Sequence, residues 1–255
     1  MTPAMNTTLT ALIVFGCLIG AVLLGRGLRR VLPQEHLSAD SRDVIKLAIG
    51  LVATMSALVL GLLVSSAKGS YDTERSEVIQ MAAKVAFIDR VLAVYGPEAA
   101  EARAHFHDAV EEAVQQMWPE EARRPAQLAP SAQAGNVVYG VLQALSPHDD
   151  AQRKLKEQAI SVGIDIGQLR SLLVAQSVPS ISKPMLIILV LWLAIIFLGF
   201  SALAPPNITT IFALTVSAVA VSGAIFLILE LDQPFGGVIR ISSEPMVNAL
   251  NQFAK

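Results

Sequence analysis

The sequence is poor in charge and in cysteine. Charged residues make up 16% of the 255 positions, against about 25% in an ordinary soluble domain. Cys17 is the one cysteine, so the chain can form neither an internal disulfide nor a cysteine metal cluster. The net charge is −2, which argues against a nucleic-acid-binding protein. Hydrophobic residues make up 53%, and this proportion with so few charges indicates a membrane protein.

Enzyme motifs are lacking as well. The sequence holds no GxSxG, HExxH or P-loop pattern, which argues against the hydrolases, metalloproteases and nucleotide-binding enzymes that carry them. His105 and His107 stand two residues apart on an expected helix, so they point to different faces and form no metal site together. We therefore expect no enzyme, and no catalytic residue, metal or cofactor.

Long uncharged apolar stretches dominate instead. Four of them reach the roughly 20 residues needed to cross a bilayer. They run from about Thr7 to Gly25, Leu47 to Ala67, Pro184 to Ala202 and Ile208 to Leu229. The first is followed, not preceded, by positive charge, so we expect an uncleaved span rather than a signal peptide. The predicted fold is an all-α membrane protein with four transmembrane helices and a helical extramembrane domain inserted between spans 2 and 3.

The domain organisation follows from these spans. We expect 1–67 to hold spans 1 and 2 with an Arg-rich loop, 68–183 to form the extramembrane domain, 184–229 to hold spans 3 and 4, and 230–255 to form a tail. Within the domain, two sets of apolar residues recur at intervals of 3 and 4, as on one face of a helix. The sets are Val78, Met81, Val85, Ile88, Leu92 and Tyr95, and Leu155, Ala159, Val162, Ile166, Leu169 and Leu173. They favour helices that pack within one chain or against copies in other subunits.

Helix boundaries are predicted from proline, glycine and capping residues. No proline interrupts the second span or the apolar stripe after it, which predicts one helix of about 53 residues that ends at Tyr95, before Gly96-Pro97. Ser146, with the proline after it, predicts the N-cap of a later helix. Between them we expect a loop over Pro119–Pro130 and a short helix over Asn136–Leu145.

Basic residues in the short loops predict an orientation. Arg26, Arg29, Arg30 and Arg42 lie between spans 1 and 2, whereas the loop 203–207 has no Lys or Arg. The positive-inside rule then places the Arg-rich loop in the cytoplasm and the extramembrane domain in the periplasm of a bacterial inner membrane. Basic residues at the opposite ends of the spans oppose this orientation.

Small residues recur on the first two spans. Span 1 carries two pairs of small residues four positions apart, Gly16 with Gly20 and Ala21 with Gly25. Span 2 carries a small residue at every fourth position, which we call the small-residue ridge. The ridge consists of Ala53, Ala57, Gly61, Ser65 and Gly69. Small residues let helix backbones approach closely in lipid. We therefore expect span 2 to pack tightly against span 1 or another subunit, and we predict a homo-oligomer.

Hydroxyl groups are the polar side chains at membrane depth. They include Thr54 and Ser65 on span 2 and Thr215 and Ser222 on span 4. They predict either a water-lined path or hydroxyls that bond back to the carbonyls of their own helices. No charged side chain lies at this depth, which argues against a proton-coupled transporter but not against a passive pore.

Two acids mark the end of span 4. Glu230 and Asp232 follow the span directly, and a short motif that ends the helix comes next. That motif contains Pro234, Phe235, Gly236 and Gly237. In an oligomer Glu230 would repeat as an acidic ring, as in cation-channel vestibules. In a single chain it would pair with Arg240 or Lys46.

Four segments of the chain stand out together. They are 28–37, 46–68, 89–98 and 230–237, and the last, with its Glu-Leu-Asp-x-Pro-Phe sequence, is the most specific. Together they resemble a bacterial family of four-span membrane proteins called bestrophin-like, over nearly the whole chain. The resemblance implies kinship with bestrophins, which are pentameric anion channels with four spans and cytosolic ends. It implies a cytosolic extramembrane domain, opposite to the charge-based orientation, and no particular catalytic or binding residue.

Two functions agree with these features. The first is an oligomeric membrane channel or pore for small ions. The second is a non-conducting membrane scaffold or sensor whose helical domain binds a protein partner. The expected partners are the lipid bilayer, further copies of this chain and small ions, and not nucleic acid.

Overall fold

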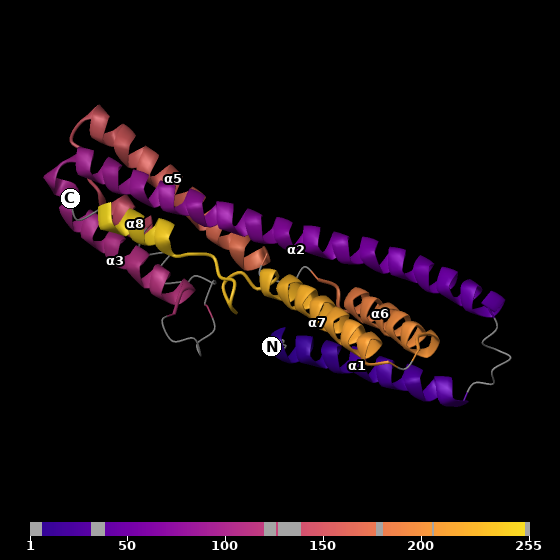
Figure 1. The fold of residues 1–255 in the computed structure, drawn as a ribbon. Coiled ribbons are helices and arrows are strands. Elements are labelled where there is room, and N and C mark those ends of the chain that lie inside the picture. Colours follow the sequence, from indigo (N-terminus) through magenta and orange to yellow (C-terminus); the bar gives the residue numbers. More distant parts are fainter. Residues whose placement is uncertain are drawn as a thin grey trace. The chain divides into compact units, whose positions relative to one another are not determined.

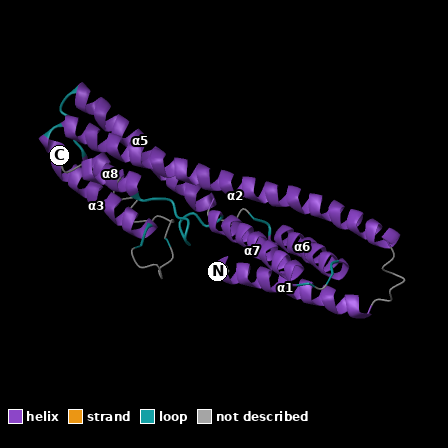
Figure 2. Cartoon of the chain, in the orientation of Figure 1, coloured by secondary structure: helices purple, strands orange, loops and turns teal. Residues whose placement is uncertain are grey.

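The computed structural model describes residues 7–31, 39–119, 126, 139–176, 181–205 and 207–252. These residues form helices and connecting loops, without a strand among them (Figure 2). The chain divides into two compact units. The membrane unit comprises Met1–Ser70 and Ser180–Asp232, and the extramembrane unit comprises Tyr71–Pro179 and Gln233–Lys255. The all-α fold predicted from the sequence is confirmed in the described residues.

Four helices are long and apolar enough to cross a membrane, as predicted. They are α1 (Thr7–Val31), α2 (Ala39–Tyr95), α6 (Lys183–Leu203) and α7 (Ile208–Leu231) (Figure 1). The second, α2, is a single helix of 57 residues, so the prediction of one helix through span 2 and the following stripe is confirmed. It ends at Tyr95 because Gly96 takes a φ of 124°, a conformation that side-chain-bearing residues rarely adopt.

The membrane unit is held together by apolar side chains of its helices. Helix α1 packs against α6 and α7 (Figure 1), and Leu18, Leu63, Leu189 and Ile225 are fully buried. Many other large apolar side chains of these helices face outward, where a bilayer would surround them. Leu12 and Leu51, for example, are more than 60% exposed. An outer surface this apolar is expected of spans in contact with lipid.

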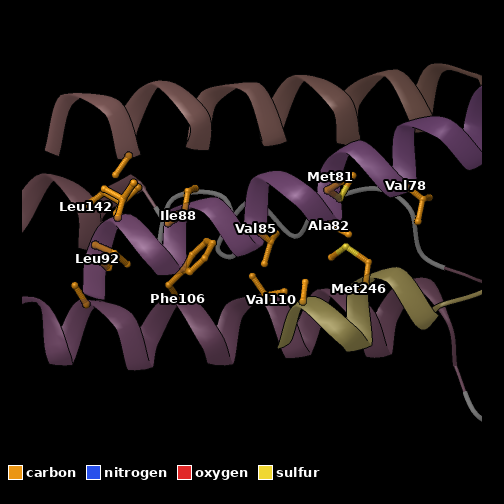
Figure 3. Packing of buried hydrophobic residues seen from close by; sticks show 14 of the residues in the cluster. Val78, Met81, Ala82, Val85, Ile88, Leu92, Phe106, Val110, Leu142 and Met246 are labelled. Carbon is orange, nitrogen blue, oxygen red and sulfur yellow. The ribbon is translucent and has the colours of Figure 1, made fainter. Parts of the chain in front are cut away.

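The extramembrane unit has its own apolar core. The predicted stripe of α2 from Val78 to Tyr95 is buried throughout, and Figure 3 shows part of it facing Phe106 and Val110. The core is completed by η2 (Pro97–Ala99), α3 (Ala100–Met117), a helix at 139–144, α5 (Asp150–Gln176) and α8 (Glu244–Gln252). Burying one Leu, Ile or Phe side chain contributes about 1.5–3 kcal/mol, so this stripe is a main source of the unit's stability.

Polar contacts show that α2 and α5 run antiparallel. Gln152 Nε2 donates to the Tyr95 carbonyl oxygen at 3.0 Å, and Lys84 Nζ donates to Asp165 at 2.6 Å. Gln176 Nε2 donates to Glu77 at 2.9 Å. From one contact to the next, the residue numbers fall along α2 while they rise along α5. Both stripes therefore pack within one chain, which is the first of the two predicted alternatives.

The predicted start of α5 is wrong by a few residues. Asp149, not Ser146, caps this helix, because its Oδ1 accepts the backbone N–H of Gln152 at 2.7 Å. The Gln152 side chain in turn accepts the backbone N–H of His148 at 2.8 Å. Two acceptors competed for the position, and the one with a reciprocating glutamine caps the helix. The predicted short helix is described over 139–144.

Some predictions fall on residues that the structure does not describe. The loop predicted over Pro119–Pro130 lies outside the described residues except for 119 and 126. The first part of the short helix, 136–138, lies outside them too, as does the 32–37 part of the family-like segment between spans 1 and 2.

Candidate functional site

The acid at the end of span 4 is buried in the membrane unit. Glu230 lies in the last turn of α7 with 1% of its surface exposed. The hydroxyl of Thr7, at the start of α1, donates a hydrogen bond to Glu230 Oε1. A buried carboxylate is costly without hydrogen-bond donors, so the bond from Thr7 stabilises Glu230. The same bond joins the beginning of the first span to the end of the last. Sequence reasoning missed Thr7, although it is the first hydroxyl of span 1.

The partners predicted for Glu230 have other contacts in the structure. Lys46 Nζ lies 2.9 Å from Asp43 Oδ1, and both side chains are mostly exposed. Arg240 accepts through its carbonyl oxygen a long hydrogen bond from the Tyr71 hydroxyl, at 3.5 Å. A ring of Glu230 side chains and a pair with Lys46 or Arg240 both stay predictions. Asp232 is half-buried and caps α7, with its N–H bonded to Ile228 O at 3.2 Å.

The tail motif folds into a turn within the extramembrane unit. Ile241 N–H donates to Pro234 O at 2.8 Å, and Gly236 N–H donates to Gln233 O at 3.0 Å. Gly237 takes a φ of 71°, which favours glycine. The geometry explains the glycine at Gly237, because its backbone conformation is one that other residues rarely adopt.

An aromatic pair anchors this turn. The rings of Phe235 and Trp118 lie 5.9 Å apart at 59°, and Trp118 Nε1 donates to Ile241 O at 2.8 Å. Phe235 is part of the buried core of the unit. The motif thus attaches the tail to the end of α3. Trp118 was not singled out by sequence reasoning, because nothing in its own neighbourhood points to a partner 117 residues away.

The hydroxyls at membrane depth differ in burial, and some of them bond back to their own helices. Thr54 Oγ1 bonds back to Gly50 O at 2.9 Å, and Ser217 Oγ bonds back to Ala213 O at 2.9 Å. Thr54 and Ser65 are exposed on α2 and Thr215 is half-buried. Ser222 is buried, and its hydroxyl has no partner among the described residues. A water-lined path along these hydroxyls therefore stays a prediction.

Two spans approach closely at Gly25, one of the small residues singled out on span 1. A Cβ on Gly25 would clash with Leu198 O and lie 2.9 Å from Ser201 Cβ. Next to it, Ser201 Oγ donates to Val22 O at 2.6 Å. Helices α1 and α6 thus approach closely through Gly25, as small residues permit in lipid. The spacing of Ala21 and Gly25, four residues apart, carried this signal.

The small-residue ridge is not used in this way. A Cβ on Gly61 would meet nothing within 4 Å, and the same holds at Gly16, Gly20 and Gly69. Ala57 and Ser65 are exposed, and Ala53 is half-buried. In a single chain the ridge therefore leaves an open strip along α2. The prediction that it packs against another subunit is left standing, without a test.

Two polar groups of the extramembrane unit were not predicted. Asp89 is buried and bonded at two points by Arg103, through Nε and through Nη2 at 2.9 Å to Oδ2. This hydrogen bonding raises the pKa of the Arg103 guanidinium. On α3, His107, Asp108 and Glu111 offer ligand atoms within 4.8 Å of one another. The spacing of His107 and Glu111, four residues apart, was visible in the sequence, but exposed groups of this kind are common without a metal.

The family model described as "Bestrophin-like domain" matches residues 16–246. The match begins within α1 and ends within α8, and it takes in α2, α6, α7, the other helices of the extramembrane unit and the tail motif. No curated protein and no solved structure matches the chain.

Proposed function

The chain belongs to the bestrophin-like family, and from this premise we propose that it forms an oligomeric channel for small ions. The family suggests a membrane ion channel in general terms. The observation that carries the proposal is the open small-residue ridge on α2, together with exposed hydroxyls at Thr54 and Ser65. One chain alone buries too little of α2 to enclose a path, so conduction would require several copies.

Assembly around α2 would give a narrow path with weak polarity. Ridge residues carry no side chain or a small one, so the α2 helices of neighbouring copies can approach closely. Where they do not touch, the small side chains leave space for ions. A hydroxyl that bonds back to its own helix, such as that of Thr54, still has a lone pair to offer. Because the spans hold no charge at depth, passage would be passive rather than coupled to protons.

The alternative is a membrane scaffold or sensor that does not conduct. It is favoured by the extramembrane unit, which has a separate core and ties the tail motif to α3. In that case the spans would only anchor the chain. Both alternatives place the protein in a membrane. We propose the bacterial inner membrane, with the Arg26–Arg42 loop in the cytoplasm.

Assembly and conduction are tested together by Gly61→Leu. We expect the wild type to show a homo-oligomeric mass in mild detergent and unitary currents in planar bilayers. Gly61→Leu should disperse the oligomer and abolish the currents, because the leucine would separate the α2 backbones. Gly223→Leu is the matched control, since Gly223 lies on α7 and a Cβ there also meets nothing within 4 Å. A monomeric wild type, or an oligomer without currents, would favour the scaffold.

A further inference from the structure

The extramembrane unit contains a cavity of about 780 Å³. Its walls come from α2, α3, the helix at 139–144, α5 and α8, and they are mostly apolar. Met81, Phe106, Leu142 and Met246, which Figure 3 shows in this part of the core, are among the lining residues. A cavity of this size lies within the range of about 300–1,000 Å³ found for sites that bind small molecules.

Two glycines of α5 leave room in this cavity. Gly163 and Gly167 are four residues apart and both line it. Glycine inside a helix costs stability relative to alanine, so its presence calls for a reason. Close packing is not the reason at Gly167, where a Cβ would meet nothing within 4 Å. At Gly163 the nearest atom, Leu142 Cδ1, would lie at 3.4 Å. At Gly167 the missing side chain therefore leaves space at the cavity wall, and at Gly163 the glycine also faces the helix at 139–144.

One charged group reaches the apolar cavity. Among the described residues that line it, Arg170 is the charged one. Its Nη2 donates to Gln116 Oε1 over a long 3.4 Å, and Gln116 Nε2 donates to Glu112 at 2.9 Å. Burial lowers the pKa of Arg170, while the carboxylate of Glu112 acts in the opposite direction. A desolvated guanidinium is stabilised by an anion that can bond to its planar donors.

We propose that this cavity binds a single-chain anionic amphiphile, with the hydrocarbon chain inside and the head group on Arg170. The apolar walls suit a hydrocarbon chain, and the methionines Met81, Met117 and Met246 adapt to chains of different shape. The nearby Glu112 disfavours a head group with more than one negative charge. The four membrane-spanning helices also place the chain in a bilayer, and a bilayer contains such molecules. The proposal holds whether or not the protein conducts ions.

The test is photo-crosslinking of the full chain in lipid nanodiscs. The probes are palmitic acid, lysophosphatidylglycerol and hexadecanol, each with a diazirine on the alkyl chain, and labelled peptides are mapped by mass spectrometry. We expect the two anionic probes to label peptides of α3 and α5, and unlabelled palmitate to compete with them. The stronger of the two identifies the head group as carboxylate or phosphate. Labelling of α1, α6 and α7 by surrounding lipid serves as the internal standard.

Variants of α5 separate the cavity from its surroundings. Gly167→Leu should lower labelling of α3 and α5 about tenfold or more, because the leucine side chain would occupy part of the space that Gly167 leaves open at the cavity wall. Ser161→Leu, at an exposed position of the same helix that does not line the cavity, should leave it unchanged. Arg170→Gln should reduce labelling by the acid to the level of the alcohol.

Three results would overturn the proposal. The first is labelling confined to the membrane-spanning helices. The second is equal labelling of the extramembrane unit by hexadecanol and palmitic acid in the wild type. The third is a Gly167→Leu variant that melts like the wild type and labels as strongly as Ser161→Leu. If Gly167→Leu fails to fold, the comparison of Arg170→Gln with the wild type decides the matter.

Discussion

Thr7 and Glu230, which are 223 residues apart in the sequence, are joined by a buried hydrogen bond from the threonine hydroxyl to the carboxylate. The contact ties the beginning of α1 to the last turn of α7. Glu230 therefore has a structural contact at the end of α7, since the hydroxyl of Thr7 on another span donates a hydrogen bond to it. Whether the carboxylate also acts through its charge can be separated from this structural role.

Glu230→Gln makes that separation, because glutamine keeps the size and one acceptor oxygen. If Glu230 forms an acidic ring, we expect altered charge selectivity with the assembly intact, since the field at the mouth falls while the shape stays. If it pairs with a basic residue, we expect a lower melting temperature, partly restored when Arg240 or Lys46 is also neutralised. The measurements are bilayer recording and thermal unfolding in detergent.

Thr7→Val is the control for the hydrogen bond itself. It removes the donor without changing the shape, and the loss should cost about 1–3 kcal/mol because the acceptor is buried. If Glu230→Gln leaves selectivity, flux and melting temperature all unchanged, the acid has neither role.

Gly25 sets the distance between α1 and α6. We expect Gly25→Ala to destabilise the protein by about 1–3 kcal/mol, because the added methyl group would meet the backbone of α6, which cannot move aside as a flexible side chain can. Gly16→Ala, on the same helix but with open space around it, should leave the stability unchanged or raise it by up to about 1 kcal/mol, because alanine favours a helix more than glycine does. Thermal unfolding in detergent measures both. Equal melting temperatures for the two variants would show that the helices are not held this close.

The Asp89–Arg103 pair predicts an asymmetry between its two partners. Asp89 is the more buried, with 8% of its side chain exposed against 30% for Arg103. Arg103→Met leaves a buried carboxylate without its two-point partner and should cost about 3–5 kcal/mol. Asp89→Asn should cost less, because the remaining guanidinium is partly in water. The double variant Asp89→Leu with Arg103→Met should recover much of the loss. If Asp89→Asn lowers the stability more than Arg103→Met does, the prediction is wrong, and Arg103 is not the main group that stabilises the buried carboxylate.

The orientation in the membrane is tested with cysteines in a Cys17→Ser background. The charge rule predicts that Ser161→Cys, in the extramembrane unit, reacts with a membrane-impermeant thiol reagent in intact spheroplasts. Gly27→Cys, which is exposed near the Arg-rich loop, should react only after lysis. The reversed pattern would place the extramembrane unit in the cytosol, as the likeness to bestrophins implies.

The sequence predicted the features that depend on local periodicity. Val78, Met81 and Val85 recur at helical spacing, and the geometry of a helix then requires that they share one face. The length of α2 followed in the same way, because no proline interrupts it and Gly96 ends it. The start of α5 was missed because Ser146 and Asp149 are both good caps, and the choice depends on Gln152.

Tertiary contacts were beyond the sequence. The bond between Thr7 and Glu230 depends on which helix ends lie together, and no local pattern states that. The cavity is lined partly by Gly163 and Gly167, which have no side chains. A glycine in a helix does not by itself predict a cavity, because it can also mark close packing or a helix end. The small-residue ridge was visible in the sequence, but only the structure shows that Gly61 lies in open space on a single chain.

Ion flux across liposomes tests the central proposal most directly. Purified wild-type protein is reconstituted in liposomes that hold a salt gradient, and release of chloride and of potassium is measured against protein-free liposomes and against Gly61→Leu. We predict flux of a small ion that rises with the amount of protein and is lost in Gly61→Leu but kept in Gly223→Leu. Absence of chloride and potassium flux from liposomes that contain intact, oligomeric wild-type protein would contradict the channel and leave the scaffold as the better account.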